Sequence, residues 1–112
     1  MELKRLMRLQ AEFDKDHPRF CDWSVKITDR NLEVLQFLMV CMIGELGEFA
    51  NTVKKVIRGD FSLASRRKEI EEEITDVFIY LVKICNQMDI DLEVNFLKKL
   101  EKNKGRFKER RV

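Results

Sequence analysis

The segment VLQFLMVCMIGELGE, from Val34 to Glu48, joins an apolar run directly to two glutamates. Nine of the ten residues from 34 to 43 are apolar, and Gln36 is the exception. A helix that is apolar on nearly every side must be buried on nearly every side. A domain of 112 residues offers little cover for such a helix. The segment therefore predicts that the chain associates with itself, as a homodimer or a dimer of dimers.

Composition predicts an all-α fold. The chain has one proline and four glycines, which are too few turn-forming residues for a β-rich domain. We expect four main helices, with a central antiparallel hairpin, in a helical bundle that is completed by homo-oligomerisation. The expected helices span residues 2–15, about 28–58 with Thr28 or Asp29 as the cap and Gly59 as the stop, 66–88 with Ser65 as the cap, and a last helix from Asp89 or Asp91 to Gly105.

Charge, cysteines and hydropathy indicate the surroundings of the chain. The net charge is +2, and the basic residues are not interleaved with aromatic ones, so nucleic acid is not an expected partner. Cys21, Cys41 and Cys85 lack metal-ligand spacing, which favours a reducing compartment. The longest wholly apolar run, residues 37–43, is too short to cross a bilayer. We therefore expect a cytoplasmic protein with no membrane partner.

Two pairs of acidic residues stand out, Glu45 with Glu48 and Glu73 with Asp76. Residues three apart lie on one face of a helix, with Cβ atoms about 5–6 Å apart. Four carboxylates brought together would repel one another unless a cation joined them. Hard oxygen ligands select Mg²⁺ or Mn²⁺, and magnesium commonly shares its coordination shell with substrate phosphates. If the pairs meet, they predict a metal site for phosphate chemistry.

A hairpin that turns near residues 60–61 would bring the two pairs to the same level. The same register sets the apolar residues 34–43 against 78–87, which are also mostly apolar. Loop position and apolar matching therefore favour one register.

Two other interpretations of the acids compete with this one. The acids could form a solvated face, in which Arg67–Glu71 and Lys68–Glu72 are ordinary i,i+4 pairs and Glu72 is at most a reserve ligand. A di-iron carboxylate bundle requires Glu-x-x-His on two helices. It fails here, because the only histidine, His17, lies in a predicted connection.

Three segments form an ordered set: ELGEFA at 45–50, EEITDVFIYL at 72–81 and KLEKNKGRF at 99–107. They resemble the E-x-G-E-L-A, E-E-L-x-D-V-L-x-Y-L and K-x-x-x-N-x-x-R-[FY] motifs of the MazG-like, all-α nucleoside triphosphate pyrophosphohydrolases. The motifs bracket residues 45–107. We therefore expect a MazG-like domain over residues 1–107 and a basic C-terminal tail over residues 108–112.

The resemblance implies an enzyme that hydrolyses (deoxy)nucleoside triphosphates to a monophosphate and pyrophosphate in nucleotide-pool housekeeping. It implies that Mg²⁺, or Mn²⁺, is bound by Glu45, Glu48, Glu73 and Asp76. Glu45 or Glu48 would be the catalytic residue that orients or deprotonates the attacking water. Asn51 stands where many relatives carry another acid, which bears on the number of metal ions.

The resemblance also implies substrate-binding positions. They are Lys99, Asn103 and Arg106 for the phosphates or nucleotide, Tyr80 near the sugar, and Trp23, with His17 and Phe20, for the base. Each has a structural alternative; bulky groups such as Trp23 can simply cover the core. Two alternative functions remain open at this point. One is a phosphoribosyl-ATP pyrophosphohydrolase-like enzyme, and the other is a non-catalytic helical interaction module.

Overall fold

The computed structural model describes residues 2–18 and 22–110, with side chains described up to Phe107. Its elements are α1 (Glu2–Asp16), α2 (Leu32–Ile57), α3 (Leu63–Gln87) and α4 (Leu92–Arg110). No strand occurs in the described ranges, so the prediction of four helices in an all-α fold is confirmed. Cys21 and Phe20 lie outside the described residues.

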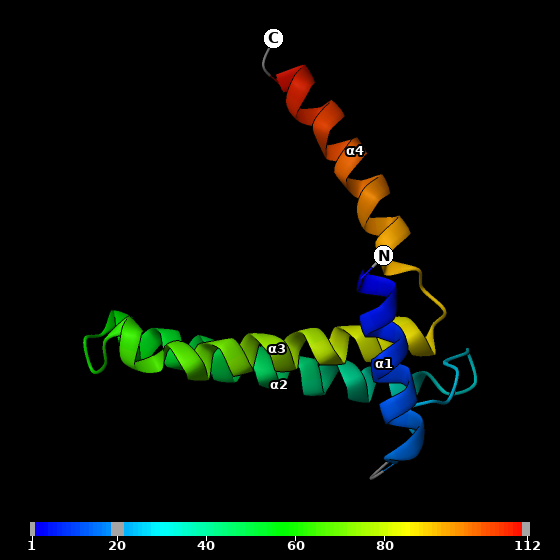
Figure 1. The fold of residues 1–112 in the computed structure, drawn as a ribbon, viewed down its shortest axis with the longest axis horizontal. Helices are drawn as coiled ribbons and strands as arrows, with labels where there is room; N and C mark the ends of the chain where they lie inside the picture. The colour runs from blue at the N-terminus through cyan, green and yellow to red at the C-terminus, as the bar shows by residue number, and fades with distance from the viewer. Residues whose placement is uncertain (1, 19–21, 111–112) are drawn as a thin grey trace.

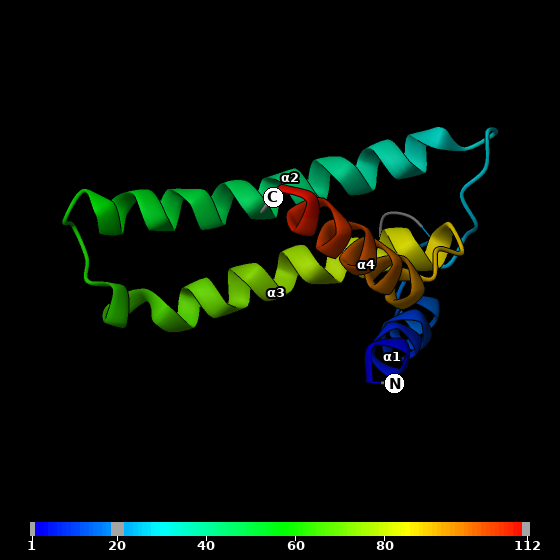
Figure 2. The same ribbon diagram turned by 90° about the horizontal axis from the view of Figure 1, so that it is seen from above.

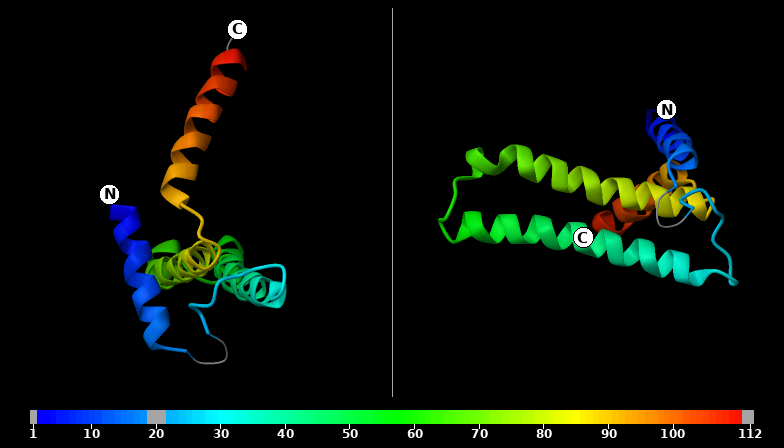
Figure 3. Two further views of the ribbon diagram at one scale, coloured as in Figure 1. Left: turned by 90° about the vertical axis from the view of Figure 1, so that its right-hand side faces the viewer. Right: turned by 90° about the horizontal axis from the view of Figure 1, so that it is seen from below.

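The helices α2 and α3 lie side by side and run in opposite directions (Figures 1 and 2). The helix α1 crosses α3 near its C-terminal end, and α4 projects away from the other three (Figures 1 and 3). The main packing between helices is that of α2 with α3 and of α1 with α3. Within the one chain, then, the four helices form a pair with two attached arms rather than a closed bundle.

The start of α2 corrects the prediction of Thr28 or Asp29 as its cap. The helix begins at Leu32, after Asn31. Residues 28–31 form a turn instead, in which Asn31 N donates to Thr28 O at 3.2 Å. The Asn31 side chain fixes this turn, because its Oδ1 accepts from Thr28 N at 2.6 Å and its Nδ2 donates to Lys26 O at 2.9 Å.

The loop between α2 and α3 confirms the prediction at its first end and corrects it at its second end. Gly59 has φ +90°, the left-handed conformation that glycine adopts at a helix stop, so its prediction is confirmed. The predicted cap of α3, Ser65, is wrong by one turn. Ser62 is the cap, and its hydroxyl accepts from Ser65 N at 3.2 Å, so α3 begins at Leu63.

The helix α4 starts as predicted and ends later than predicted. Asp91 Oδ1 accepts from Val94 N at 3.0 Å, which caps the first turn. Gly105 does not end the helix, which continues to Arg110 and so includes part of the predicted tail. Glycine stops a helix by adopting positive φ, and Gly105 does not do so.

The core of the single chain is small. Among the described residues, the buried apolar side chains are Met7, Trp23, Leu38, Val82 and Cys85. Met7, Val82 and Cys85 form a cluster in which α1 packs on α3. Asn86 Nδ2 donates to Met7 O at 2.9 Å, so a polar contact supports the same crossing.

The chain exposes more surface than a folded monomer of its size. Its accessible area is 8880 Å² at 13.4 kDa, against about 6,500 Å² expected for a compact monomer. The radius of gyration is 17.4 Å, against about 13 Å. Large exposed apolar side chains lie on α2 and α4, among them Phe37, Val40, Ile43, Leu46, Phe96, Leu97 and Phe107.

None of the helices in the described part of the chain is long and apolar enough to cross a membrane.

The buried position of Leu38 generates a stability prediction. Leu38→Ala is expected to lower the free energy of unfolding by about 2–5 kcal/mol, because it leaves a cavity at a fully buried site. Ile57→Ala is the matched control on the same helix, since Ile57 is 81% exposed. It should change that free energy by less than about 0.5 kcal/mol. Urea unfolding followed by circular dichroism measures both, and equal losses would contradict the placement of Leu38.

Candidate active site

The four predicted acids lie on the two paired helices, with Glu45 and Glu48 on α2 and Glu73 and Asp76 on α3. Thr52 connects the two helices at this level. Its Oγ1 lies 3.0 Å from Glu73 Oε2 and 3.1 Å from the Glu48 carbonyl oxygen. The Thr52 hydroxyl therefore holds the Glu73 carboxylate against α2.

The pKa of Glu45 is raised above its ordinary value. Burial is the largest cause, and the negative charges of Glu48, Asp76 and Glu73 add to it. Glu45 is thus within electrostatic reach of the other three acids. The structure brings the two pairs into one electrostatic neighbourhood.

The donor chemistry of this neighbourhood fits a hard divalent cation. Glu73 Oε1 is buried and has no hydrogen-bond partner, so it is a carboxylate oxygen available to a ligand. Glu48 and Asp76 are exposed and can turn toward an ion. Across residues 2–18 and 22–110, however, no three His, Cys, Asp or Glu side chains are already gathered closely enough to hold a metal. An ion would therefore have to draw the exposed acids inward.

Glu72, the reserve ligand, lies beside the site. It lines an open hollow on α3 together with Lys68, Glu71, Thr75 and Asp76. Asp76 thus borders this hollow and also acts on Glu45.

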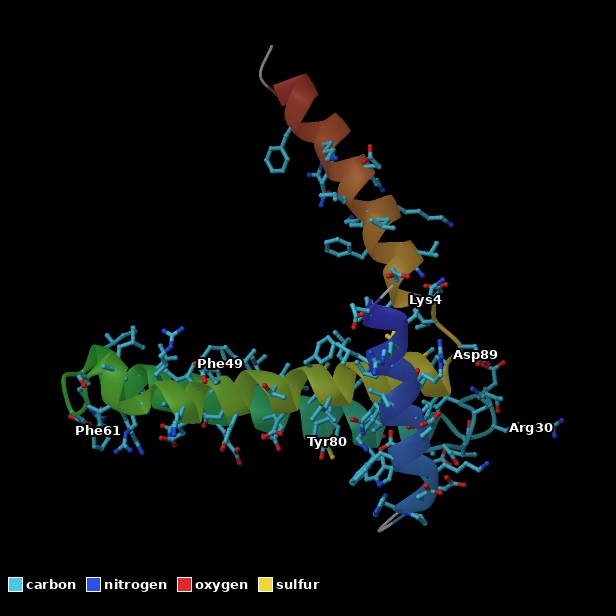
Figure 4. All side chains as sticks on the ribbon, viewed as in Figure 1. Lys4, Arg30, Phe49, Phe61, Tyr80 and Asp89 are labelled. Carbon is cyan, nitrogen blue, oxygen red and sulfur yellow. The ribbon has the colours of Figure 1, made fainter. Side chains whose placement is uncertain are left out.

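Tyr80 links the acids to an aromatic cluster that is formed by Trp23 and Phe37. Its pKa is raised by burial first, then by Cys41 and by the charges of Glu45 and Asp76. The Tyr80 ring also meets Trp23 edge-on, with centroids 6.5 Å apart. In Figure 4, Tyr80 points to the side of the paired helices away from α4. Tyr80 therefore lies between the acids and Trp23.

Trp23 is 9% exposed and covered on its faces. It stacks with Phe37 of α2 at 5.9 Å between centroids, and Lys83 Nζ of α3 lies 4.4 Å from its ring centroid. Trp23 is thus the buried member of the aromatic cluster, while Phe37 and Tyr80 are more exposed.

His17 is tied to the end of α1. Its Nδ1 lies 2.8 Å from Phe13 O, and its ring stacks on Phe13 with centroids 4.1 Å apart. These partners place His17 with α1, so the structure gives it no contact with the acids among the described residues.

The structure does not bring Lys99, Asn103 and Arg106 to the acids of the same chain. All three lie on α4, beyond the first turn where the helix is anchored. That anchor consists of Leu92, which packs on the core cluster, and Glu93, whose Oε2 is 3.8 Å from Lys4 Nζ. The remainder of α4 leads away from α2 and α3 (Figures 1 and 3).

Three site neighbours were missed at the sequence level: Thr52, Cys41 and Phe37. Thr52 had a usable signal, because it follows Glu48 by four residues and so shares its helix face. Cys41 and Phe37 had none, since each is one apolar residue within an apolar run.

Comparisons with known proteins identify relatives of the chain. A family model described as the MazG nucleotide pyrophosphohydrolase domain matches residues 34–111. The Gene 37 protein of Mycobacterium phage L5 is 32% identical over 78 residues, which are 68% of each chain. Human dCTP pyrophosphatase 1 is 29% identical over 109 residues, and its rat counterpart 30% over 109 residues. Each match covers 94% of this chain and 58% of the relative, so the chain spans little more than half of these pyrophosphatases. No solved structure matches the chain significantly.

The raised pKa of Glu45 generates a pH prediction. A carboxyl group whose folded pKa is raised contributes stability below its ordinary value, 4.5, and that stability is lost as pH rises through the folded pKa. In EDTA, Glu45→Gln should therefore unfold at a higher urea concentration than the wild type at neutral pH. The advantage should shrink toward pH 4.5. Glu12→Gln, an exposed acid on α1, is the control and should show neither effect.

Proposed function

Because the chain belongs to the MazG nucleotide pyrophosphohydrolase family, we propose that it hydrolyses (deoxy)nucleoside triphosphates between the α- and β-phosphates. The products would be a nucleoside monophosphate and pyrophosphate. The observation that supports the proposal is that Glu45 of α2 lies within electrostatic reach of Glu73 and Asp76 of α3, and that Glu45 and Asp76 act in turn on Tyr80. The physiological role would be housekeeping of the nucleotide pool.

The metal of the proposed reaction is Mg²⁺, or Mn²⁺, held by Glu45, Glu48, Glu73 and Asp76. The unpartnered Glu73 Oε1 and the crowding around Glu45 support this assignment. When bound, the ion neutralises the triphosphate and polarises the scissile phosphorus. Thr52 contributes by fixing Glu73 through the oxygen that is not free for a ligand.

The attacking water is oriented or deprotonated by Glu45 or Glu48. Glu45 is the favoured proton acceptor of the two, because its side chain is half-buried whereas that of Glu48 is exposed. Glu45 also lies near the half-buried Tyr80, on whose pKa its charge acts.

The substrate class is a pyrimidine deoxynucleoside triphosphate. Human and rat relatives are named dCTP pyrophosphatase 1, which makes dCTP the first candidate for this chain. Tyr80 lies between the acids, where the phosphates would bind, and the cluster of Trp23 and Phe37. The sugar would lie near Tyr80 and the base beside the cluster.

The assembly is a homodimer, or a dimer of dimers, in which α4 of a partner subunit completes each site. The chain exposes apolar surface on α2 and α4 that a partner could cover. Its own α4 leads away from the side to which Tyr80 points (Figure 4). Lys99, Asn103 and Arg106 would therefore reach the phosphates bound by a neighbouring chain.

The first test is incubation with a triphosphate panel and Mg²⁺, with the products identified. The panel contains the common nucleoside triphosphates, their deoxy forms and phosphoribosyl-ATP. We expect monophosphate and pyrophosphate from dCTP at the highest kcat/KM. Glu48→Gln and Asp76→Asn should lose at least about 100-fold, because each removes a charged metal ligand. Glu71→Gln, an exposed acid paired with Arg67, is the control and should keep wild-type activity.

Three results would contradict the proposal. They are release of orthophosphate, full activity in both acid variants, and preferential cleavage of phosphoribosyl-ATP. The non-catalytic module makes its own prediction, since it requires no change of melting temperature with Mg²⁺ or Mn²⁺. A metal-dependent rise that is lost in Asp76→Asn would argue against that module.

The second test mixes two inactive variants. Asp76→Asn keeps an intact α4, and Arg106→Ala keeps intact acids. If α4 acts on the partner, subunit exchange should restore up to about one quarter of wild-type activity, since half of the dimers would be mixed and each would hold one complete site. Glu48→Gln mixed with Asp76→Asn is the control and should restore nothing. No recovery in the first mixture, with mixed dimers verified by mass, would exclude the shared site.

A further inference from the structure

A buried ion pair lies behind the aromatic cluster. Lys83 Nζ of α3 is 2.6 Å from Asp14 Oδ1 of α1, and the two side chains are 10% and 2% exposed. Gln10 Nε2 donates to the same Asp14 oxygen at 2.9 Å. Asp14 Oδ2 is buried without a partner. The pair joins residues 69 positions apart in the sequence.

Stability alone is a poor explanation of this pair. Removing two charges from water costs several kcal/mol per ion, and an apolar pair of similar volume is often equally stable or more stable. The unpartnered Asp14 Oδ2 adds to the cost. A comparable contact in this chain, Lys26 Nζ to Asp89 Oδ1 at 2.7 Å, is exposed and avoids that cost. The buried pair therefore calls for a role beyond joining α1 to α3.

The contact between Lys83 and Trp23 indicates that role. The ammonium group lies 4.4 Å from the Trp23 ring centroid, within the range of a cation–π interaction. Phe37 stacks with Trp23, and Tyr80 meets it edge-on. Lys83 is held by Asp14, so its charge has a fixed place over the indole. Trp23 in turn contacts Phe37 and also Tyr80, the ring that lies near the acids.

We propose that Lys83 and Asp14 are positioning residues for substrate, acting through Trp23. Asp14 fixes the Lys83 ammonium, the ammonium fixes the indole, and the indole fixes Tyr80 and Phe37 for the nucleoside. This role rests on the proposed function, because it requires a nucleotide at the acids and Tyr80. It also gives α1 a task, since the helix that supplies Asp14 contributes none of the acids.

The pair has a direct spectroscopic readout. Trp23 is the one tryptophan of the chain, so emission excited at wavelengths that tyrosine does not absorb reports on this residue alone. Lys83→Met keeps the length of the side chain and removes its charge, and it should shift the emission maximum. Lys83→Arg keeps the charge and should retain the wild-type emission. Lys26→Met removes the exposed lysine of the Lys26–Asp89 pair and should also retain it.

The kinetic readout separates positioning from general damage. For dCTP with Mg²⁺, Lys83→Met should raise KM about tenfold or more, because misplacing a binding group by ~1 Å can cost up to about 100-fold. Its kcat should stay within about twofold of wild type, since the acids are untouched. Lys83→Arg should restore KM, and Lys26→Met should leave it unchanged.

A double variant distinguishes positioning from a merely structural role. Lys83→Met alone leaves a buried unpaired carboxylate and should lower the urea midpoint. Adding Asp14→Asn removes that charge and should recover much of the midpoint. Emission and KM should not recover, because Trp23 still lacks the ammonium. Recovery of all three together would show that the pair serves stability only.

The remaining outcomes also decide the question. Wild-type emission in Lys83→Met, or a shifted emission with an unchanged KM, would overturn the positioning role and leave the proposed function intact. A wild-type protein that releases pyrophosphate from no triphosphate would overturn the proposed function instead, and with it any role of the pair toward a nucleotide.

Discussion

The repulsion among four carboxylates on α2 and α3 is the constraint on which the site depends. Burial is the largest cause of the raised pKa of Glu45, the repulsion adds to it, and the repulsion also sets the charge that any ligand must offset. The helices tolerate it because their other halves bury apolar side chains, Leu38 on α2 and Val82 with Cys85 on α3. Thr52 also supplies a hydroxyl to Glu73. The apolar halves thus hold the acids near one another, where a bound cation would offset their charge.

The same pair of helices links the site to assembly. A chain that buries so few of its described apolar side chains leaves much of α2 exposed, and its α4 leads away from α2 and α3, the helices that carry the acids. The residues that resemble phosphate ligands lie on this unpacked helix. Burial of the apolar surface and completion of the site would then be one event, because the partner that covers α2 would also bring its own α4. A monomer would have the acids, but it would lack Lys99 and Arg106 of a partner, the positive side chains that would offset the charge of the substrate.

The sequence predicted the elements better than their ends. The four helices follow from apolar periodicity, and the stop at Gly59 follows from a conformation that favours glycine. The prediction of Ser65 as the cap of α3 was wrong, because Ser62 stands three residues earlier and its hydroxyl accepts from the Ser65 amide. Two equivalent side chains were therefore candidates for the same cap. The prediction that Gly105 ends the helix was wrong, because glycine allows a helix to end but does not force it to end. Such choices depend on local bonds that composition does not determine.

Within the site, local spacing predicted the acid pairs, whereas contacts between residues distant in the sequence could not be predicted. Asp14 and Lys83 illustrate the difference. Lys83 is the single charged residue in residues 77–85, and Asp14 is one of several charges on α1, so nothing local connects them. Only the crossing of α1 over α3 places the ammonium between Asp14 and Trp23. A charge that interrupts an apolar helical half therefore identifies a position worth following, while its partner has to come from the packing.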